Sequence, residues 1–482
     1  MKKNLYYFTI IFLIISSLFL FFSCTKLIEL EKIDYVDLKA SFFMSDIVAR
    51  EGQTIEFTQT ATIVAKQFDW TFGNQLKSNL PNPTTIYNNF GKYNVTLVVK
   101  KEQGNLVDST KKTITIIPKT QQATREFFFG DATTDEQGFC ITDAENNGFL
   151  LVGRQAINVL YIVRINNAGV KLWEKKIDNI TLGTITPRAA FKTADDDYII
   201  VGNYQYNTTD NDAFIIKLAK DGNSERWRIV RNTSQSEEYT SVVQYGNRIL
   251  IGGSATSVST TGVTNKILLE EYNLDGILQS SQTDGTNWKL NSAEFALDGF
   301  TCAITEASSP SLIFYNTAFE QRRKRTLDFL EGSANDVTTL DDGFVTVGYY
   351  LSNELDLNGN RTKHAFISRI SNFAQYDWAI KVRKTEIFAE EFKRVIQLES
   401  DESFIAIGTN INPLSGKDIL VCKYDKNGNL LKYKLIGNIK DDEGFDVKVI
   451  SPTEFYIFGT FQQISGLERR DFYLIKLNKD LE

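Results

Sequence analysis

Residues that could perform acid–base or nucleophilic chemistry are scarce in this sequence. Histidine occurs once, at His364, so a metal centre that needs several histidines is excluded. A Ser-His-Asp triad would have to use His364, which lies in "GNRTKHAFISR" beside the expected start of a strand, where a packed or solvated histidine is more typical. The sequence contains no phosphate-binding glycine loop and no Cys/His metal spacing. It therefore predicts a protein that is not an enzyme and that uses no cofactor or metal.

Three cysteines follow the N-terminal region, and each stands in an apolar, strand-like context. Cys140 lies in "GFCIT", Cys302 in "GFTCAIT" and Cys422 in "ILVCKY". Three cysteines leave at least one unpaired, and a free cysteine among apolar residues behaves as a small buried hydrophobic side chain. We predict buried thiols and no disulfide framework.

One segment resembles half of a calcium loop. It has the form Asp356-x-Asn358-x-Asn360, but Gly359 stands one place early and no bidentate acid follows at the required distance. The segment is therefore predicted to be a polar loop.

The elements that must position these residues are strands that repeat after Thr124. An apolar strand ending in glycine recurs six times, as "GFLLVG", "DYIIVG", "RILIGG", "GFVTVG", "SFIAIG" and "EFYIFG", with the glycines at Gly153, Gly202, Gly252, Gly348, Gly408 and Gly459. "GFTCAIT" occupies the corresponding place in a further unit. A variable loop and a hairpin follow each strand, with turns such as Lys-Asp-Gly that accept positive φ. Seven units of about 51 residues fit the size of four-stranded propeller blades.

These units resemble the seven-bladed β-propeller repeats of bacterial surface proteins, whose form is Asp-Ala-Phe-x-x-Lys-Leu. Asp212–Leu218 matches this form closely, and Asp471–Leu477 matches it without the alanine. The last unit ends at "FYLIKLNKDLE" without a fourth strand, whereas "REFFFGD" before the first unit is a strand without a partner. We predict that this N-terminal strand completes the last blade and closes the ring, which spans residues 124–482.

Residues 36–118 form a separate unit with period-2 apolar alternation, as in "GKYNVTLVVKK". The unit resembles a PKD domain, an immunoglobulin-like β-sandwich. The resemblance rests on Trp70-Thr71-Phe72-Gly73-Asn74, on Phe90-Gly91-Lys92-Tyr93 and on alternating Val95, Leu97 and Val99. It implies that Trp70 and Phe72 fill a core. The predicted fold class is all-β, with this sandwich before a seven-bladed β-propeller that is closed by an N-terminal latch strand.

The N-terminus predicts an extracytoplasmic, lipid-anchored protein. Lys2 and Lys3 precede the apolar run "LYYFTIIFLIISSLFLFF" and then Ser23-Cys24, so residues 1–23 are expected to be a signal peptide. The Ser23-Cys24 junction resembles the lipobox of bacterial lipoproteins, which implies lipidation of Cys24, a tether over residues 24–35 and placement at a bacterial outer membrane. An uncleaved membrane anchor is the alternative, because about 18 apolar residues can span a bilayer.

Acidic residues recur just before each predicted first strand of the propeller. In a propeller these positions share one face, which would then attract cations or a basic partner. The alternative, which we favour, is that the acids cap turns and keep the rim solvated. The candidate residues of this acidic face are Asp135, Glu136, Glu237, Glu238, Asp336, Glu390, Glu391, Asp442 and Glu443.

The composition narrows the class of ligand. The net charge is −7 and no basic cluster is evident, which excludes nucleic acid as a partner. Long variable loops on a rigid scaffold usually carry binding specificity. We therefore predict a lipid-anchored binding or interaction protein, with the propeller as the platform for a glycan or protein ligand and the PKD-like domain as a spacer. The alternatives are an accessory lipoprotein of an outer-membrane complex and, third, a carbohydrate-active enzyme with paired carboxylates.

Overall fold

The computed structural model describes most of the chain after residue 37. The described ranges are 38–89, 91–101, 107–117, 125–131, 133–178, 183–205, 210–260, 262–296, 299–329, 331–355, 361–382, 389–412, 416–438, 440–463 and 469–482. The predicted signal segment, Cys24 and the calcium-like loop lie outside them. The chain divides into two compact units, Met1–Ile116 and Ile117–Glu482. Within the described ranges, no helix is both long enough and apolar enough to cross a membrane.

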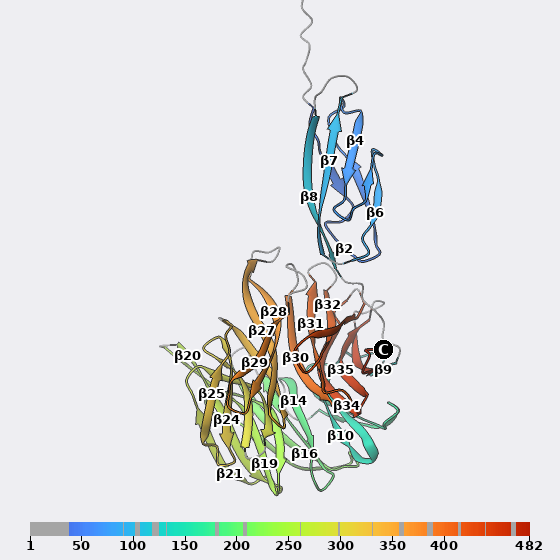
Figure 1. Cartoon of the computed structure of the whole chain (residues 1–482). Helices are drawn as coiled ribbons and strands as arrows, with labels where there is room; N and C mark the ends of the chain where they lie inside the picture. Colours follow the sequence, from blue (N-terminus) through green and yellow to red (C-terminus); the bar gives the residue numbers. More distant parts are fainter. Residues whose placement is uncertain are drawn as a thin grey trace, which may run out of the picture. The chain divides into compact units, whose positions relative to one another are not determined.

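The first unit is a β-sandwich of two sheets, with strand orders β1-β3-β6 and β2-β8-β7-β4-β5 (Figure 1). Its strands are β1 (Phe42–Met44), β2 (Val48–Arg50), β3 (Thr54–Gln59), β4 (Gln67–Thr71), β5 (Lys77–Ser78), β6 (Thr84–Ile86), β7 (Gly91–Lys100) and β8 (Val107–Ile117). Trp70 and Phe72 are both 1% exposed and pack against Phe57 between the sheets. The Trp70 Nε1–H donates to the Leu80 carbonyl at 2.9 Å, which satisfies its polar atom.

The second unit contains seven four-stranded sheets in its described residues, which we number as blades 1 to 7 in chain order. Blades 1 to 3 consist of β10 (Glu136–Ala144), β11 (Gly148–Gln155), β12 (Val159–Ile165) and β13 (Lys171–Ile177), with the 3-10 turn η1 (Glu145–Asn147) after β10; β14 (Thr184–Lys192), β15 (Tyr198–Gln205), β16 (Asn211–Leu218) and β17 (Glu225–Arg231); β18 (Ser236–Tyr245), β19 (Arg248–Ser259), β20 (Gly262–Asn273) and β21 (Leu278–Asp284).

Blades 4 to 7 repeat the same antiparallel order. They consist of β22 (Trp288–Ala296), β23 (Gly299–Glu306), β24 (Ser309–Asn316) and β25 (Gln321–Thr326); β26 (Gly332–Leu340), β27 (Gly343–Leu355), β28 (Arg361–Ser371) and β29 (Tyr376–Lys381); β30 (Ala389–Leu398), β31 (Ser403–Asn412), β32 (Gly416–Tyr424) and β33 (Leu430–Ile436); β34 (Glu443–Ser451), β35 (Glu454–Gln462), β36 (Arg470–Asn478) and the N-terminal β9 (Glu126–Phe129).

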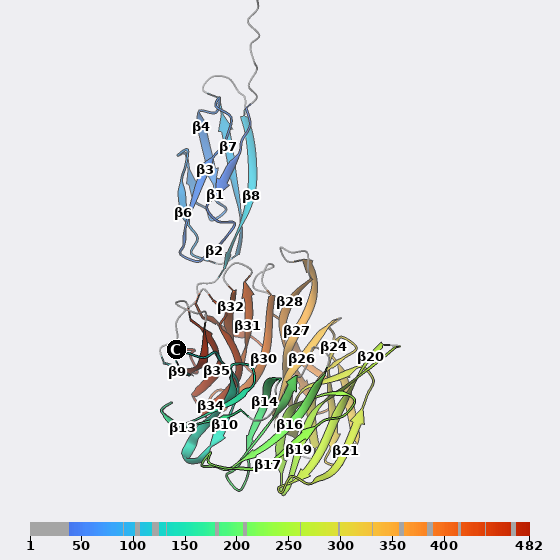
Figure 2. The same cartoon turned by 180° about the vertical axis from the view of Figure 1, so that it is seen from behind.

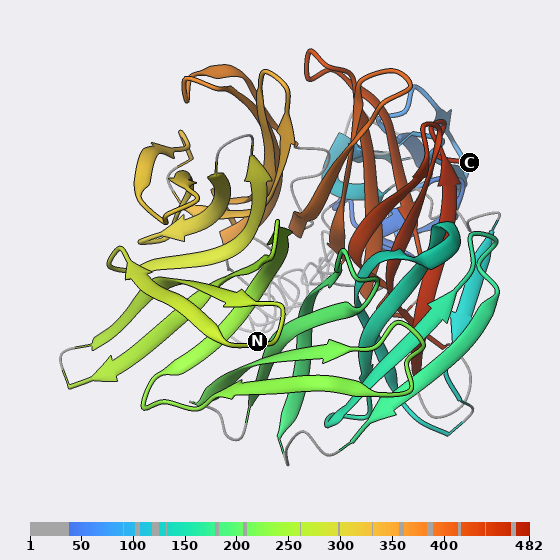
Figure 3. The same cartoon turned by 90° about the horizontal axis from the view of Figure 1, so that it is seen from below.

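The blades close into a ring around their first strands. Each first strand contacts the first strand of the next blade, and β34 of blade 7 contacts β10 of blade 1. In the view from below, the colours run around the ring, and the teal start and the red end of the propeller meet (Figure 3). The predicted all-β class, with a sandwich and a seven-bladed propeller, is confirmed.

The latch strand is also where the sequence placed it. β9 pairs antiparallel with β36, with Phe129 opposite Phe472 and Glu126 opposite Ile475. β9 lies beside the last blade in both side views (Figures 1 and 2). The first and last described segments of the propeller therefore share one sheet, in which β9 covers the edge of β36.

Burial explains why the central strands of each blade read as continuous apolar runs. The second and third strands are covered on both faces by the neighbouring blades, as in β15 and β16, whose residues are almost all buried. The fourth strands form the outer rim. Their residues either alternate between buried and exposed or are mostly exposed, as in β21 and β25. Each blade can therefore be recognised within about 50 residues of sequence, as two apolar strands followed by a more polar one.

Candidate functional site

Each first strand carries a β-bulge at the same place. The register between the first and second strands shifts by one residue in all seven described blades. A bulge adds one residue that has no partner and re-aims its side chain. The residues skipped by the register are Phe139, Arg188, Thr240, Asn291, Asn335, Lys393 and Phe445.

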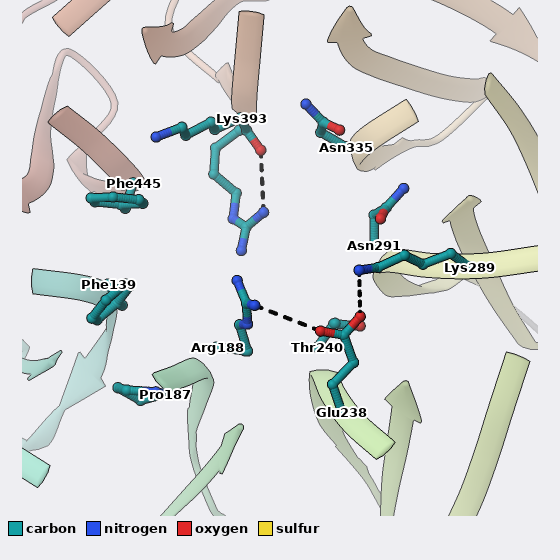
Figure 4. A pocket seen from close by; sticks show the side chains of 11 residues that line it. Phe139, Pro187, Arg188, Glu238, Thr240, Lys289, Asn291, Asn335, Lys393 and Phe445 are labelled. Carbon is teal, nitrogen blue, oxygen red and sulfur yellow. Dashed lines mark hydrogen bonds and ion pairs between the residues drawn. The ribbon is translucent and has the colours of Figure 1, made fainter. Parts of the chain in front are cut away.

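All seven bulge residues line one cavity at the centre of the propeller. The cavity has a volume of about 220 Å³, and its remaining lining residues are Pro187, Glu238, Lys289 and Arg394. The side chains of Phe139 and Phe445 stand on one side of the central space, and Asn291, Asn335 and Lys289 stand on the other (Figure 4). One scaffold position, repeated seven times with different residue types, thus builds an asymmetric site.

The order of blades places like side chains together. The aromatic residues come from adjacent blades 1 and 7, with ring centroids 5.2 Å apart. A cation flanks them on each side, Arg188 from blade 2 and Lys393 from blade 6. The Nζ of Lys393 lies 3.8 Å from the centroid of the Phe445 ring, a cation–π contact. Hydroxyl and amide side chains from blades 3 to 5 complete the ring.

The carboxylates at the rim of this cavity are each shared by two cations. Glu238 contacts Lys289 at 2.7 Å and Arg188 at 3.6 Å. Glu443 contacts Lys393 at 3.1 Å and Lys417 at 2.8 Å. The cluster of Arg188, Lys289 and Glu238 therefore keeps one positive charge in excess, which favours an anion at the cavity. Around Glu443, the charges of Asp441 and Glu391 also act on Lys417, so the second cluster is compensated.

A second cavity, of about 500 Å³, lies further along the first strands and shares Arg394 with the first. Arg394 Nε lies 3.4 Å from Asp446 Oδ1, and the Arg394 charge also acts on Asp336. Burial raises the pKa of both aspartates, and Arg394 opposes this rise. Burial, with Asp336 nearby, also raises the pKa of Glu294 to about 7.

The same aspartates connect neighbouring blades. Asp336 Oδ2 accepts a hydrogen bond from the Val395 N–H of blade 6 at 3.0 Å. Asp446 accepts one from the Ile141 N–H of blade 1 at 2.9 Å. Each of these aspartates is the residue directly after the bulge of its own strand. Asp336 is buried and links the first strands of blades 5 and 6, so it does not lie on an exposed acidic face.

Four of the predicted acidic residues are buried and contact their own blade or the turn before it. Glu136 accepts from Gln155 at 2.7 Å, and Glu237 accepts from the Thr233 hydroxyl. Glu390 accepts from Tyr433 Oη at 2.9 Å. Asp442 accepts from the backbone N–H groups of Asn438 and Gln462. All four are at most 1% exposed.

The other predicted acids are ion-paired. Asp135 holds Arg470 through two guanidinium contacts, at 2.9 and 2.6 Å, and thereby links blade 1 to blade 7. Glu391 contacts Lys363 at 3.0 Å, and Glu238 and Glu443 are the shared rim carboxylates. The nine acids thus do not form a common exposed acidic surface.

Replacing Asp442 by asparagine tests the buried acids. Burial raises the pKa of Asp442 to about 7, whereas an unfolded aspartate titrates near ~3.9. The folded chain therefore holds a proton that the unfolded chain has lost, so this residue's contribution to stability falls as the pH rises from about 4 to 7. We expect the stability of D442N relative to wild type to increase by up to ~1.4 kcal/mol per pH unit over that range.

The measurement is urea unfolding at several pH values. The control is D328N, because the Asp328 side chain is exposed and its ion pair with Arg325 is long, at 3.7 Å. If the free energy of unfolding of D442N runs parallel to that of the wild type between about pH 4 and 7, the raised pKa of Asp442 is contradicted.

The single histidine and the three cysteines are core residues. His364 is 0% exposed, and its ring centroid lies 5.6 Å from that of Tyr350. Burial lowers the pKa of His364, which favours the neutral ring. Cys140, Cys302 and Cys422 are free and buried. Among the described residues, no group of three or more His, Cys, Asp or Glu side chains is arranged to hold a metal ion.

Comparison with known proteins identifies the sandwich. Residues 40–116 match the PKD domain family. The PKD domain thus accounts for the first unit, in agreement with the resemblance drawn from Trp70 and Phe72. No curated protein matches the chain.

The propeller is similar to several solved structures. One is a quinoprotein alcohol dehydrogenase-like protein from Bacteroides thetaiotaomicron (10% identity, TM-score 0.40, covering 80% of this chain and 93% of that one). Another is a protein of unknown function from Dyadobacter fermentans (9% identity, TM-score 0.43, 73% and 98%). A third is the polysaccharide lyase Uly1 (9% identity, TM-score 0.46, 75% and 100%).

Sequence reasoning missed the bulge residues, although a signal for them was present. The recurring glycine of the second strand lies opposite the residue just before the bulge. A Cβ at Gly408 would stand 1.8 Å from the Glu391 carbonyl oxygen, and one at Gly459 would stand 1.8 Å from that of Glu443. In blade 3 the glycine in this role is Gly253, not the predicted Gly252. Blade 4 keeps its bulge with Ile304 there, so glycine accompanies the bulge but is not required for it.

Proposed function

We propose that this protein is a lipid-anchored binding protein of the bacterial outer membrane, whose propeller binds an anionic ligand in the central cavity. The PKD domain acts as a spacer, and lipidation at Cys24 supplies the anchor. The observation that carries the proposal is the ring of seven bulge residues. A structural core would have no use for five polar and two aromatic side chains of different types at one repeated position.

The charges around the cavity favour binding over carboxylate chemistry. Arg188, Lys289, Lys393 and Arg394 line the cavity, whereas Glu238 is the one carboxylate among its described lining residues. Lys289 and Arg188 both contact that carboxylate. A glycosidase of the two-carboxylate kind requires an acid and a nucleophile or base facing each other. We therefore place binding ahead of catalysis.

The test is a ligand screen with variants of the bulge ring. The full chain, purified in detergent micelles, is applied to arrays of glycans and of peptides. R188A and K393A should each weaken binding of the ligands found by about tenfold, since each removes a charge-assisted contact. The matched control is R322A on the outer strand β25, where Arg322 is exposed and has a 3.5 Å contact with Glu320. Binding that survives both R188A and K393A would place the ligand site elsewhere.

A further inference from the structure

We propose that the central cavity recognises one uronic acid unit of an acidic saccharide, with Arg188 holding the carboxylate. This inference rests on the proposed function and names the ligand class. Three parts of the cavity support it: an aromatic side, a row of fixed hydrogen-bond acceptors, and a guanidinium that has only long contacts.

The aromatic side suits the apolar face of a sugar ring. Phe139 and Phe445 are half-buried, and their rings are tilted by 48° at the edge of the cavity. The face of an aromatic ring is electron-rich and attracts the weakly positive C–H groups of a pyranose. Hydroxyl-rich ligands gain little from phenylalanine except through such a face, so two adjacent phenylalanines in a polar ring favour a sugar over a simple inorganic anion.

The opposite side presents acceptors that are held in place. The Asn291 side-chain amide donates to Ser333 Oγ at 3.0 Å and to the Ala334 carbonyl at 2.7 Å. The Asn335 amide donates to the Phe392 carbonyl at 2.7 Å. Neither side-chain carbonyl oxygen accepts a hydrogen bond from the described residues. Two fixed oxygens at a cavity that both asparagines line can accept from ligand hydroxyl groups without a cost in side-chain ordering.

Arg188 supplies the anion-binding group. Its Nη2 lies 3.6 Å from Glu238, and its Nε lies 3.4 Å from Asn203 Oδ1. Glu238 is bonded more closely by Lys289, at 2.7 Å. The Arg188 side chain points toward the middle of the cavity (Figure 4). A planar guanidinium with only long contacts can bind a carboxylate through two parallel hydrogen bonds.

The size and charge of the site select a single, singly charged unit. The volume of about 220 Å³ is below the ~300–1,000 Å³ typical of pockets for drug-sized ligands. The Arg188–Lys289–Glu238 cluster has one positive charge in excess, which one carboxylate would neutralise. A nucleotide would need room for a base and would bring more negative charge than this cluster can balance.

The test uses the full chain and matched saccharides. The probes are tetrasaccharides of glucuronate and of galacturonate, their methyl esters, and the corresponding neutral glucose and galactose tetrasaccharides, measured by isothermal titration. We expect at least one uronate to bind about tenfold or more tightly than its methyl ester and its neutral counterpart. R188A should remove this preference, R188K should retain part of it because lysine keeps the charge but not the bidentate geometry, and R322A should have no effect.

The outcomes separate this inference from the proposed function. Equal affinity for a uronate, its methyl ester and the neutral sugar would overturn the carboxylate assignment and leave the cavity as a sugar site. A second outcome is that none of these saccharides binds, while a ligand from the screen binds the wild type more tightly than R188A and K393A. This outcome would overturn the saccharide inference and leave the binding function in place. If uronate binding is unchanged in R188A and in F139A, the central cavity is not the binding site. The proposed function of the cavity and the uronate inference are then both overturned.

Discussion

Replacing Arg125–Gly130 by six glycine and serine residues should abolish cooperative unfolding of the propeller. The replacement keeps the chain length but removes the strand that pairs with β36. Phe129 is 9% exposed and belongs to a core cluster that contains Phe149 of blade 1 and Phe472 of blade 7. Loss of β9 therefore separates the two blades at which the ring closes and exposes the edge of β36.

Two smaller substitutions show whether β9 acts through packing. F129A should destabilise the propeller by roughly 3–5 kcal/mol, because it leaves a cavity in a buried aromatic cluster. F128A is the matched control: Phe128 is 47% exposed and stacks on the Tyr473 ring at the rim, 5.2 Å away, so its effect should be small. Scanning calorimetry and urea unfolding measure both. A propeller transition that survives the glycine–serine replacement unchanged would show that the ring does not depend on its latch.

R394M should destabilise the propeller by up to roughly 3–5 kcal/mol at neutral pH, since it removes one partner of a largely buried ion cluster. Arg394 stands between Asp336 and Asp446, whose carboxylates also bond the neighbouring first strands. Without the guanidinium, both aspartates would lose the cation that favours their charged form. The effect should exceed that of any exposed ion pair, which contributes ~0–1 kcal/mol.

The dependence on pH identifies the cause. Burial already raises the pKa of Asp336 and of Asp446, and the loss of Arg394 should raise both further. A group whose pKa is higher in the folded chain stabilises it at low pH and loses that contribution as the pH rises. The defect of R394M should therefore shrink in acid, and R394M/D336N/D446N should recover stability at neutral pH. The exposed-site control is R322M. A pH-independent defect would indicate lost packing instead of uncompensated charge.

Much of the fold could be read from the sequence because its signals are local. Strands covered on both faces become continuous apolar runs, hairpins need turn residues, and these features return in every unit of about 50 residues. The incomplete last unit and the unpaired "REFFFGD" were sufficient to predict the latch, because an orphan strand and a missing strand satisfy each other. Trp70 and Phe72 identified the PKD domain in the same way.

The site could not be read in this way, because its residues are far apart in the sequence and become neighbours only at the axis of the ring. Phe139 and Phe445 are more than 300 residues apart, and nothing in their local sequence shows that both occupy a bulge. The acids were visible, but whether a carboxylate lies buried like Asp442 or at the rim like Glu443 depends on which face of the strand meets the channel. The sequence by itself determined the blades, their number and their closure, since each depends on local periodicity. Only the tertiary structure decided which side chains surround the cavity and which charges remain uncompensated there, because both depend on how seven inner strands meet.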